Sequence, residues 1–169
     1  MSMVRMDIES IVVGNGPATS LITLRPRHNS SPYAQTQLPI RIGMTEASAI
    51  GMGVDNVPHQ RPLTHDLLKA VITQLGATVT SVTISKVEGP TFFASVHLLT
   101  ATKERKAIDC RPSDAVALAV RTKAPIFVES DVLMTASYPD FKTVKKDEQD
   151  KELAEFHSFI ESLSPEDFS

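Results

Sequence analysis

The sequence predicts an α+β fold, in which a duplicated three-strand-plus-helix unit forms a mixed, largely antiparallel sheet with packed helices, followed by a C-terminal helix. In each half of the chain, segments of alternating apolar residues precede a segment with helical spacing. The halves match at a constant offset of 68 residues, which pairs Ile40 with Ile108, Thr45 with Ser113, Glu46 with Asp114, Ala47 with Ala115, Ala49 with Ala117, and Ile50 with Leu118.

The first half is expected to form three strands and a short helix, over residues 4–13, 20–25, 38–43 and 46–52. The cluster Gly14-Asn15-Gly16-Pro17 marks the turn between the first two strands. Thr45 is expected to cap the helix. An extra helix is expected between the copies, over residues 65–75, with Thr64 as its N-cap and Gly76 at its end.

The second half repeats the order. Strands are expected over residues 79–85, 92–98 and 107–110, a helix capped by Ser113, and a buried strand over 124–128. Phe92 and Phe93 are more typical of core residues than of base-stacking residues. Residues 147–163 place Leu153, Phe156, Phe159, Ile160 and Leu163 on one helical stripe. We therefore expect a domain over residues 1–140 and an acidic helical tail over 141–169.

Composition narrows the class of protein. The chain has 169 residues, of which 41% are hydrophobic, as in a single globular domain.

The negative charge is concentrated at the end of the chain. Residues 143–169 carry 3 Lys+Arg and 8 Asp+Glu, net −5, and residues 1–142 carry 14 and 12, net +2. Neither value is a strong electrostatic footprint for nucleic-acid binding. No stretch approaches the roughly 20 apolar residues of a membrane span. No apolar run precedes Arg5, Asp7 and Glu9, so a secretory signal is not expected, and a single cysteine fits the cytoplasm. Cys110 is either a nucleophile or, as its apolar surroundings favour, a buried filler.

The run of residues 108–115 (IDCRPSDA) concentrates charge where a strand becomes a helix. Pro112 ends the strand and holds Arg111 out of helical geometry. Asp109 and Arg111 are expected on one strand face, with Cα atoms about 6–7 Å apart. A carboxylate can hold a hard cation or activate water, and a guanidinium can stabilise phosphoryl oxygens. The alternative is a local ion pair, with Asp114 completing the helix start.

A second run, residues 61–66 (RPLTHD), repeats the pattern of Arg-Pro, hydroxyl and early acid. His65 could act as a general base near neutral pH, and Asp66 could hold a metal or orient His65. Glu46, at the position that matches Asp114, could supply another carboxylate. The alternative is that both acids simply favour their helix N-termini and that His65 is a surface residue.

Three segments, 38–43 (LPIRIG), 61–69 (RPLTHDLLK) and 108–119 (IDCRPSDAVALA), resemble the bifunctional nuclease family, with 124–128 (APIFV) behind them. The resemblance covers roughly residues 4–137. It implies an α+β domain, nuclease activity on RNA and DNA without strong sequence choice, and an oligomer. The matched positions are Arg61, His65, Asp66, Asp109, Arg111 and Asp114. The ending after residue 147 does not form the full UVR-type motif that some relatives carry.

The leading hypothesis is a low-specificity, metal-assisted nuclease that acts on DNA and RNA as a homo-oligomer (a dimer or larger). His65 would activate water, and Arg61 and Arg111 would bind phosphate. Mg²⁺ or Mn²⁺ would be held by Asp66, Asp109 and Asp114. The hypothesis requires these acids to gather in one cleft. The rivals are a non-enzymatic oligomeric module that binds nucleic acid, a small anion or a protein, and an assembly protein that exchanges its C-terminal helix between subunits.

Overall fold

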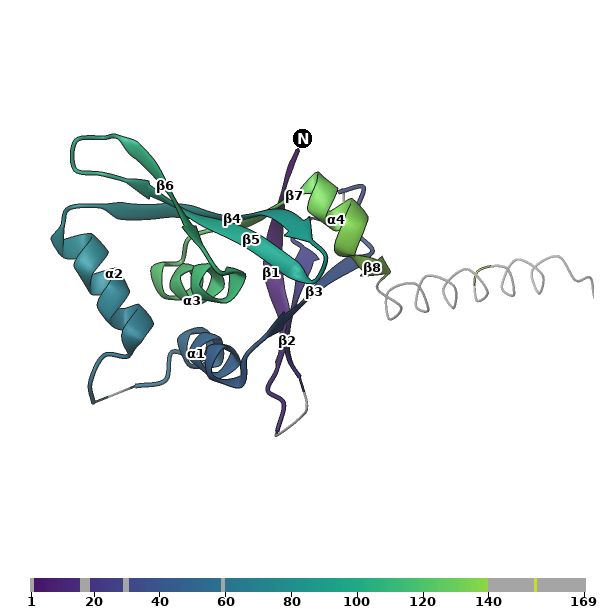
Figure 1. Cartoon of the computed structure of the whole chain (residues 1–169), viewed down its shortest axis with the longest axis horizontal. Helices are drawn as coiled ribbons and strands as arrows, with labels where there is room; N and C mark the ends of the chain where they lie inside the picture. The colour runs from purple at the N-terminus through teal and green to yellow at the C-terminus, as the bar shows by residue number, and fades with distance from the viewer. Residues whose placement is uncertain (1, 16–18, 29–30, 59, 140–153, 155–169) are drawn as a thin grey trace, which may run out of the picture. The chain divides into compact units, whose positions relative to one another are not determined.

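The computed structural model describes residues 2–15, 19–28, 31–58, 60–139 and 154. The first half of the chain forms β1 (Met3–Val12), β2 (Ser20–Pro26), β3 (Thr36–Ile42) and α1 (Met44–Val54), and α2 (Thr64–Gln74) follows. The second half forms β4 (Thr78–Glu88), β5 (Thr91–Leu99), β6 (Arg105–Cys110), α3 (Pro112–Thr122), β7 (Ile126–Glu129), α4 (Ser130–Ala136) and β8 (Tyr138–Pro139) (Figure 1).

The strands form one sheet in the order β6-β5-β4-β7-β1-β2-β3-β8. The pairs β1–β2, β2–β3, β1–β7, β4–β5 and β5–β6 are antiparallel, and β4–β7 is parallel. Strand β7 thus joins the two three-stranded halves. The mixed, largely antiparallel α+β fold predicted from the sequence is confirmed.

The two halves repeat the order of three strands and a helix, and their register explains the offset found in the sequence. Helices α1 and α3 begin at residues 44 and 112 and end at 54 and 122, and strands β3 and β6 end at 42 and 110, each 68 apart. The hairpins do not share this offset, since β1 and β4 begin 75 residues apart, at 3 and 78. The strand–helix corner is therefore the part of the unit that repeats in register.

Helices α1, α2 and α3 lie together on one side of β4, β5 and β6 (Figure 1). Ala94 and Val96 of β5 are buried, and the face of the sheet that carries them is the face toward α3. Because cross-strand partners share a face, their partners on β6 lie on the same side. The core contains the largest fully buried side chains: Met6, Ile22, Leu24, Leu38, Ile40, Ile50, Ile84, Leu118 and Leu133.

The expected N-caps were wrong for all three helices. The N-cap residues are Gly43, Leu63 and Arg111, in place of Thr45, Thr64 and Ser113, and none of the three makes a side-chain capping bond. At α3 the cause is Pro112, whose fixed φ and missing N–H suit the first helical position. The helix therefore starts before Ser113, and its hydroxyl is not needed at the cap.

Helix α4 and strand β8 were not expected from the sequence. The helix expected over residues 147–163 lies outside the described residues. In the part of the chain that the structure describes, no helix is long and apolar enough to cross a membrane.

Two glycines of α1 allow a matched test of helix packing. A Cβ on Gly53 would lie 2.6 Å from Arg121 Nη1 and 2.7 Å from Val120 Cγ2 of α3, whereas a Cβ on Gly51 would meet nothing within 4 Å. Gly53→Ala is expected to lower the free energy of unfolding by about 1–3 kcal/mol through overpacking. Gly51→Ala is expected to raise it by about 0.5–1 kcal/mol. Urea unfolding measures both, and an equal gain in both variants would contradict the close contact of α1 with α3.

Candidate functional site

An acid occupies the first turn of each of the three packed helices: Glu46 in α1, Asp66 in α2 and Asp114 in α3. Carboxylates are favoured at these positions because the helix N-terminus carries a partial positive charge. The three acids nevertheless have different partners, and these partners decide which of them can take part in a site.

Arg111 links two of the acids. It is the N-cap of α3 with an extended backbone (φ −71°, ψ 148°), as expected before a proline. Its Nε donates to Asp114 Oδ2 at 2.8 Å, and its Nη2 to Asp114 Oδ1 at 3.2 Å. Its Nη1 donates to Glu46 Oε1 at 2.9 Å. A guanidinium has five N–H groups, so two remain for another acceptor.

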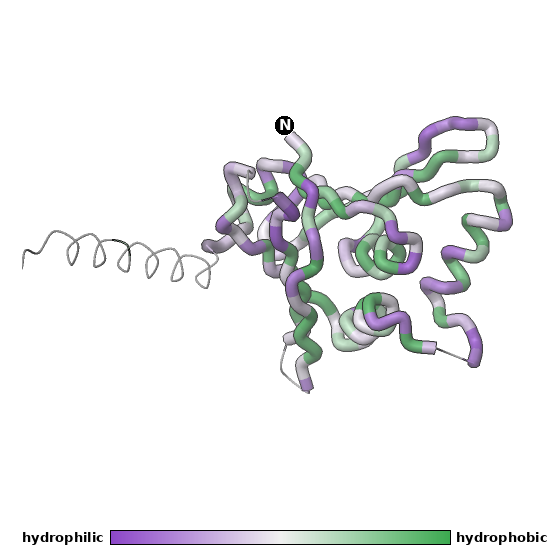
Figure 2. Tube along the Cα trace, turned by 180° about the vertical axis from the view of Figure 1, so that it is seen from behind, coloured by the Kyte–Doolittle hydropathy of each residue, from purple (hydrophilic) through white to green (hydrophobic). Residues whose placement is uncertain are grey.

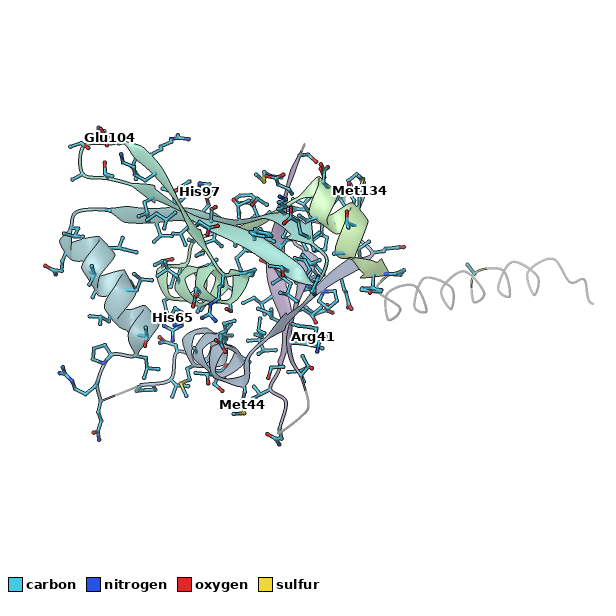
Figure 3. All side chains as sticks on the ribbon, in the orientation of Figure 1. Arg41, Met44, His65, His97, Glu104 and Met134 are labelled. Carbon is cyan, nitrogen blue, oxygen red and sulfur yellow. The ribbon has the colours of Figure 1, made fainter. Side chains whose placement is uncertain are left out.

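His65 completes the arrangement from α2. Its Nε2 lies 3.1 Å from Asp114 Oδ1, and its side chain is only 13% exposed. Figure 3 shows His65 on the side of the sheet where the helices lie. The residues Glu46, His65, Arg111 and Asp114, from the N-terminal ends of three helices, are called the polar cluster below. The sequence predicted three of them as site residues and noted Glu46 as a further carboxylate.

The polar cluster keeps both of its acids ionised. Burial raises the pKa of Asp114, but the hydrogen bonds from Arg111 and His65 outweigh it, and the net pKa is lowered. The pKa of Glu46 is lowered by a hydrogen bond from its own backbone amide and by Arg111. The hydrogen bonds to Asp114 and Glu46 in turn raise the pKa of Arg111. An ionised Asp114 is the acceptor that holds a proton on Nε2 of His65.

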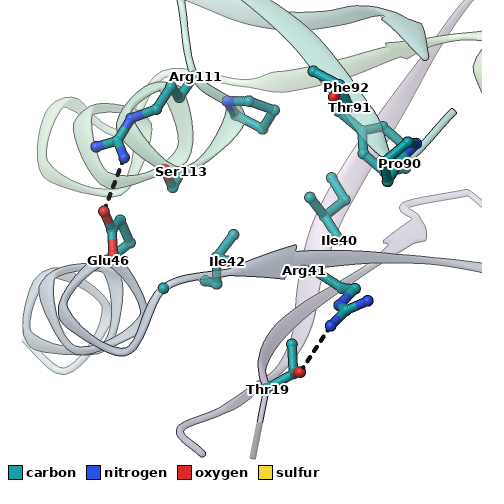
Figure 4. A pocket seen from close by; sticks show the side chains of 12 residues that line it. Thr19, Ile40, Arg41, Ile42, Glu46, Pro90, Thr91, Phe92, Arg111 and Ser113 are labelled. Atoms are coloured by element: carbon teal, nitrogen blue, oxygen red, sulfur yellow. Dashed lines mark hydrogen bonds and ion pairs between the residues drawn. The ribbon is translucent and has the colours of Figure 1, made fainter. Parts of the chain in front are cut away.

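Two cavities meet at the polar cluster. The first, the His65 cavity, has a volume of about 630 Å³ and is lined by Thr45, Glu46, Ser48, Ala49, Met52, Pro62, Leu63, Thr64, His65, Arg111 and Asp114. The second, the Phe92 cavity, has a volume of about 460 Å³ and is lined by Thr19, Ile40, Arg41, Ile42, Gly43, Glu46, Pro90, Thr91, Phe92, Arg111, Pro112 and Ser113 (Figure 4). Arg111 and Glu46 line both, so their ion pair stands between the two cavities.

Asp66 lies away from the polar cluster. Its Oδ2 accepts the backbone N–H of Leu63 at 2.9 Å, and its Oδ1 accepts Arg121 Nε at 2.7 Å. Arg121 is only 5% exposed and also donates from Nη1 to the Ala117 carbonyl. Asp66 therefore joins α2 to the last turn of α3. Arg121 was not predicted as a site residue, because nothing in the pattern of an ordinary helical arginine indicates a distant acid.

Asp109 and Arg61 line neither cavity. Asp109 pairs across strands with Ser95, whereas its neighbour Cys110 pairs with the buried Ala94. Because successive strand residues alternate, Asp109 lies on the sheet face opposite α3. Arg61 is exposed on the segment before α2. The structure thus brings His65, Arg111 and Asp114 together and leaves Asp66, Asp109 and Arg61 outside. The three acids that were expected to hold a metal ion, Asp66, Asp109 and Asp114, therefore do not gather in one cleft.

The described residues do not form a cation cage. Among them, no group of three or more His, Cys, Asp or Glu side chains could hold a metal ion. The oxygens of Asp114, and Oε1 of Glu46, accept bonds from Arg111 and His65. A cation bound here would therefore depend on further oxygens from a phosphate-bearing substrate, as Mg²⁺ commonly does.

Cys110 is not poised as a nucleophile. Burial raises the pKa of its thiol to about 11, and the charges of Asp114 and Asp109 add to this effect. The thiolate, which is the reactive form, is therefore scarce near neutral pH. Cys110 is only partly buried but packs against the hydrophobic core, so the interpretation as a filler holds while full burial does not.

Comparison with known proteins identifies relatives and a family for this chain. The proteins named "Uncharacterized protein MT1877" and "Uncharacterized protein Rv1829", from Mycobacterium tuberculosis strains CDC 1551 / Oshkosh and ATCC 25618 / H37Rv, are each 39% identical to this chain over 139 residues. The match covers 78% of this chain and 80% of each relative. Residues 30–140, which contain the whole polar cluster, match the bifunctional nuclease domain. The chain therefore belongs to the bifunctional nuclease domain family.

Proposed function

We propose that the polar cluster hydrolyses phosphodiester bonds of RNA and DNA with little sequence preference. The observation that carries the proposal is the His65–Asp114 pair beside Arg111 at the wall of a cavity. Family membership supports a nucleic acid as the ligand.

His65 is the proposed general base. Because ionised Asp114 accepts a bond from Nε2, the proton of neutral His65 is held there, and Nδ1 keeps its lone pair. No described residue hydrogen-bonds Nδ1. In the proposed reaction a water oxygen bonds to phosphorus and the P–O ester bond breaks. The water proton passes to Nδ1, and the departing oxygen takes a proton from solvent.

Arg111 is the proposed phosphate ligand. Its side chain is 63% exposed despite three hydrogen bonds, so its two remaining N–H groups can reach a substrate. A guanidinium binds two phosphate oxygens at once and stabilises the charge that grows on them during hydrolysis. Asp114 and Glu46 fix the side chain beforehand, so little rearrangement is needed when the substrate binds.

Cleavage of labelled single-stranded RNA and DNA by the full chain tests the proposal. The wild type and His97→Gln, a histidine hydrogen-bonded to Thr83 on β4, are expected to cleave both, and His65→Gln is not. Equal cleavage by all three proteins would indicate a contaminating nuclease and contradict the proposal.

The proposed hydrolysis depends on Mg²⁺ or Mn²⁺. Asp114 and Glu46 are the candidate ligands, and the ion would neutralise charge on the phosphate. EDTA should therefore lower the rate and added Mg²⁺ or Mn²⁺ restore it, whereas an unchanged rate in EDTA would contradict the metal dependence.

We also propose that a second copy of this chain covers the outer face of α2, as in a homo-oligomer. No residue of α2 is fully buried, and Leu67, Leu68 and Val71 are 56%, 42% and 44% exposed. Leu75, directly after the helix, is 76% exposed. Figure 2 shows apolar and polar residues alternating along this helix. A patch of this kind is typical of a protein interface, and a two-fold axis would place it against itself.

Mass in solution tests the interface. Leu75→Lys is expected to lower the mass measured by light scattering toward that of one chain. Met134→Lys, which changes a side chain that is 71% exposed on α4, is expected to leave the mass unchanged. A monomeric wild type, or a mass that changes only when residues 143–169 are deleted, would contradict an interface on α2.

A further inference from the structure

The Phe92 cavity has features that hydrolysis in the His65 cavity does not use. Its walls include apolar side chains from three elements, Ile42 of β3, Phe92 of β5 and Pro112 of α3 (Figure 4). Arg111 and Glu46 are the two residues that line both cavities, and their ion pair stands between the Phe92 cavity and the His65 cavity. A phosphate bound to Arg111 would therefore have directly beside it a space whose walls combine apolar and polar side chains.

Ser113 supplies a second, independent observation. The residue is only 5% exposed and lines the Phe92 cavity. No described residue hydrogen-bonds its hydroxyl. Because Arg111 is the N-cap and Pro112 the first helical residue of α3, the hydroxyl is free of the capping role that serines often have. Figure 4 shows Ser113 facing β3 across the cavity. Because the hydroxyl reaches the space of the cavity and no described residue bonds it, a polar group of a ligand can bond to it there.

A nucleobase has the chemistry that these walls accept. Its flat ring stacks on an aromatic side chain, and its edge carries both donors and acceptors of hydrogen bonds. A serine hydroxyl can donate or accept, so it can serve any of the bases. The same adaptability agrees with a nuclease without strong sequence choice.

We propose that the Phe92 cavity is a base subsite that takes one unpaired nucleobase of a single-stranded nucleic acid, stacked on Phe92 and hydrogen-bonded to Ser113 Oγ. The inference rests on the proposed function, because Arg111 at the shared wall holds the adjoining phosphate. A base within a duplex cannot enter such a cavity without leaving its stack, which costs a few kcal/mol. The substrate class is therefore single-stranded nucleic acid.

The test compares two probes of equal charge: a fluorescent hexamer of thymidine nucleotides with phosphorothioate linkages, and the same hexamer with every base removed. The wild type is expected to bind the abasic hexamer about tenfold more weakly. In Ser113→Ala and in Phe92→Leu the two hexamers should bind within about threefold of each other, because the contacts to the base are reduced. Two control variants make the same chemical changes elsewhere, Ser95→Ala and Phe93→Leu. Both residues lie on β5 and line neither cavity, so both variants should keep the tenfold difference.

Equal affinity of the wild type for the two hexamers would overturn the proposal. Equal affinity for the thymidine hexamer as a single strand and as one strand of a duplex would also overturn it. A tenfold preference that survives in Ser113→Ala and Phe92→Leu would place the base elsewhere and also overturn it. Binding is measured without cleavage, so the outcome is separate from the hydrolysis assay. A base preference without hydrolysis would retain the subsite and reject the nuclease, and hydrolysis without a base preference would do the reverse.

Discussion

Asp114→Asn is expected to lower kcat/KM for hydrolysis of single-stranded RNA and DNA by about 100- to 10,000-fold. The carboxylate of Asp114 holds the Nε2 proton of His65 and accepts two hydrogen bonds from Arg111. An amide at this position can present N–H groups to Nε2, which would favour the wrong tautomer and leave Nδ1 protonated. It would also remove the negative charge that fixes the guanidinium. Initial rates on labelled oligonucleotides measure the effect.

Asp109→Asn is the matched control for this variant. It makes the same chemical change five residues earlier, on the sheet face opposite α3, and is expected to keep nearly all activity. Circular dichroism and urea unfolding should show both variants folded. A loss in Asp109→Asn as large as that in Asp114→Asn would contradict the assignment of catalysis to the polar cluster and return Asp109 to the site.

Arg121→Ala is expected to lower the free energy of unfolding by about 3 kcal/mol, near the lower end for a broken buried ion pair. Arg121 is 5% exposed and Asp66 32%, so solvent screens only one partner. The substitution would leave the Asp66 carboxylate without its guanidinium and remove a link between α2 and α3. Because α2 carries His65, we expect activity to fall as well, through a displaced base. Urea unfolding measures the stability.

The exposed Arg105 provides the comparison for Arg121, since no ion pair of Arg105 occurs among the described residues. Arg105→Ala is expected to change the free energy of unfolding by less than about 0.5 kcal/mol. Asp66→Asn, which keeps an acceptor for the Leu63 amide but removes the charge, should cost less than Arg121→Ala. Equal stability of Arg121→Ala and Arg105→Ala would contradict the structural role of the Asp66–Arg121 pair.

The sequence predicted the repeated unit well, because alternation and helical spacing are local properties. The match of Glu46 with Asp114 correctly indicated two equivalent helix starts, both at the polar cluster. The caps were predicted wrongly because hydroxyl residues one or two positions into a helix resemble caps in sequence. Helix α4 is seven residues long, too short for its periodicity to stand out.

The candidate site was only partly predictable, for a physical reason. Residues 61–66 and 108–115 were both identified as charge-rich corners, but which carboxylate meets which cation depends on how α2 packs against α3. Packing turned His65 toward Asp114 and Asp66 toward Arg121, although the two residues are adjacent. The face of Asp109 depended on strand pairing with Ser95, which the sequence does not encode locally. Ser113 was identified only as a cap, because a hydroxyl that lines a cavity has no sequence signal.

The most direct test of the central claim, that a nucleic acid binds at the polar cluster, is an NMR titration of the wild type with the phosphorothioate thymidine hexamer, followed through the imidazole signals of the histidines. We predict that the signals of His65 shift on binding, because in the proposed reaction its Nδ1 faces the bound phosphate, while those of His97, hydrogen-bonded to Thr83, stay in place. Shifts at His97 with an unchanged His65 would contradict the claim and place nucleic-acid binding on the other face of the sheet.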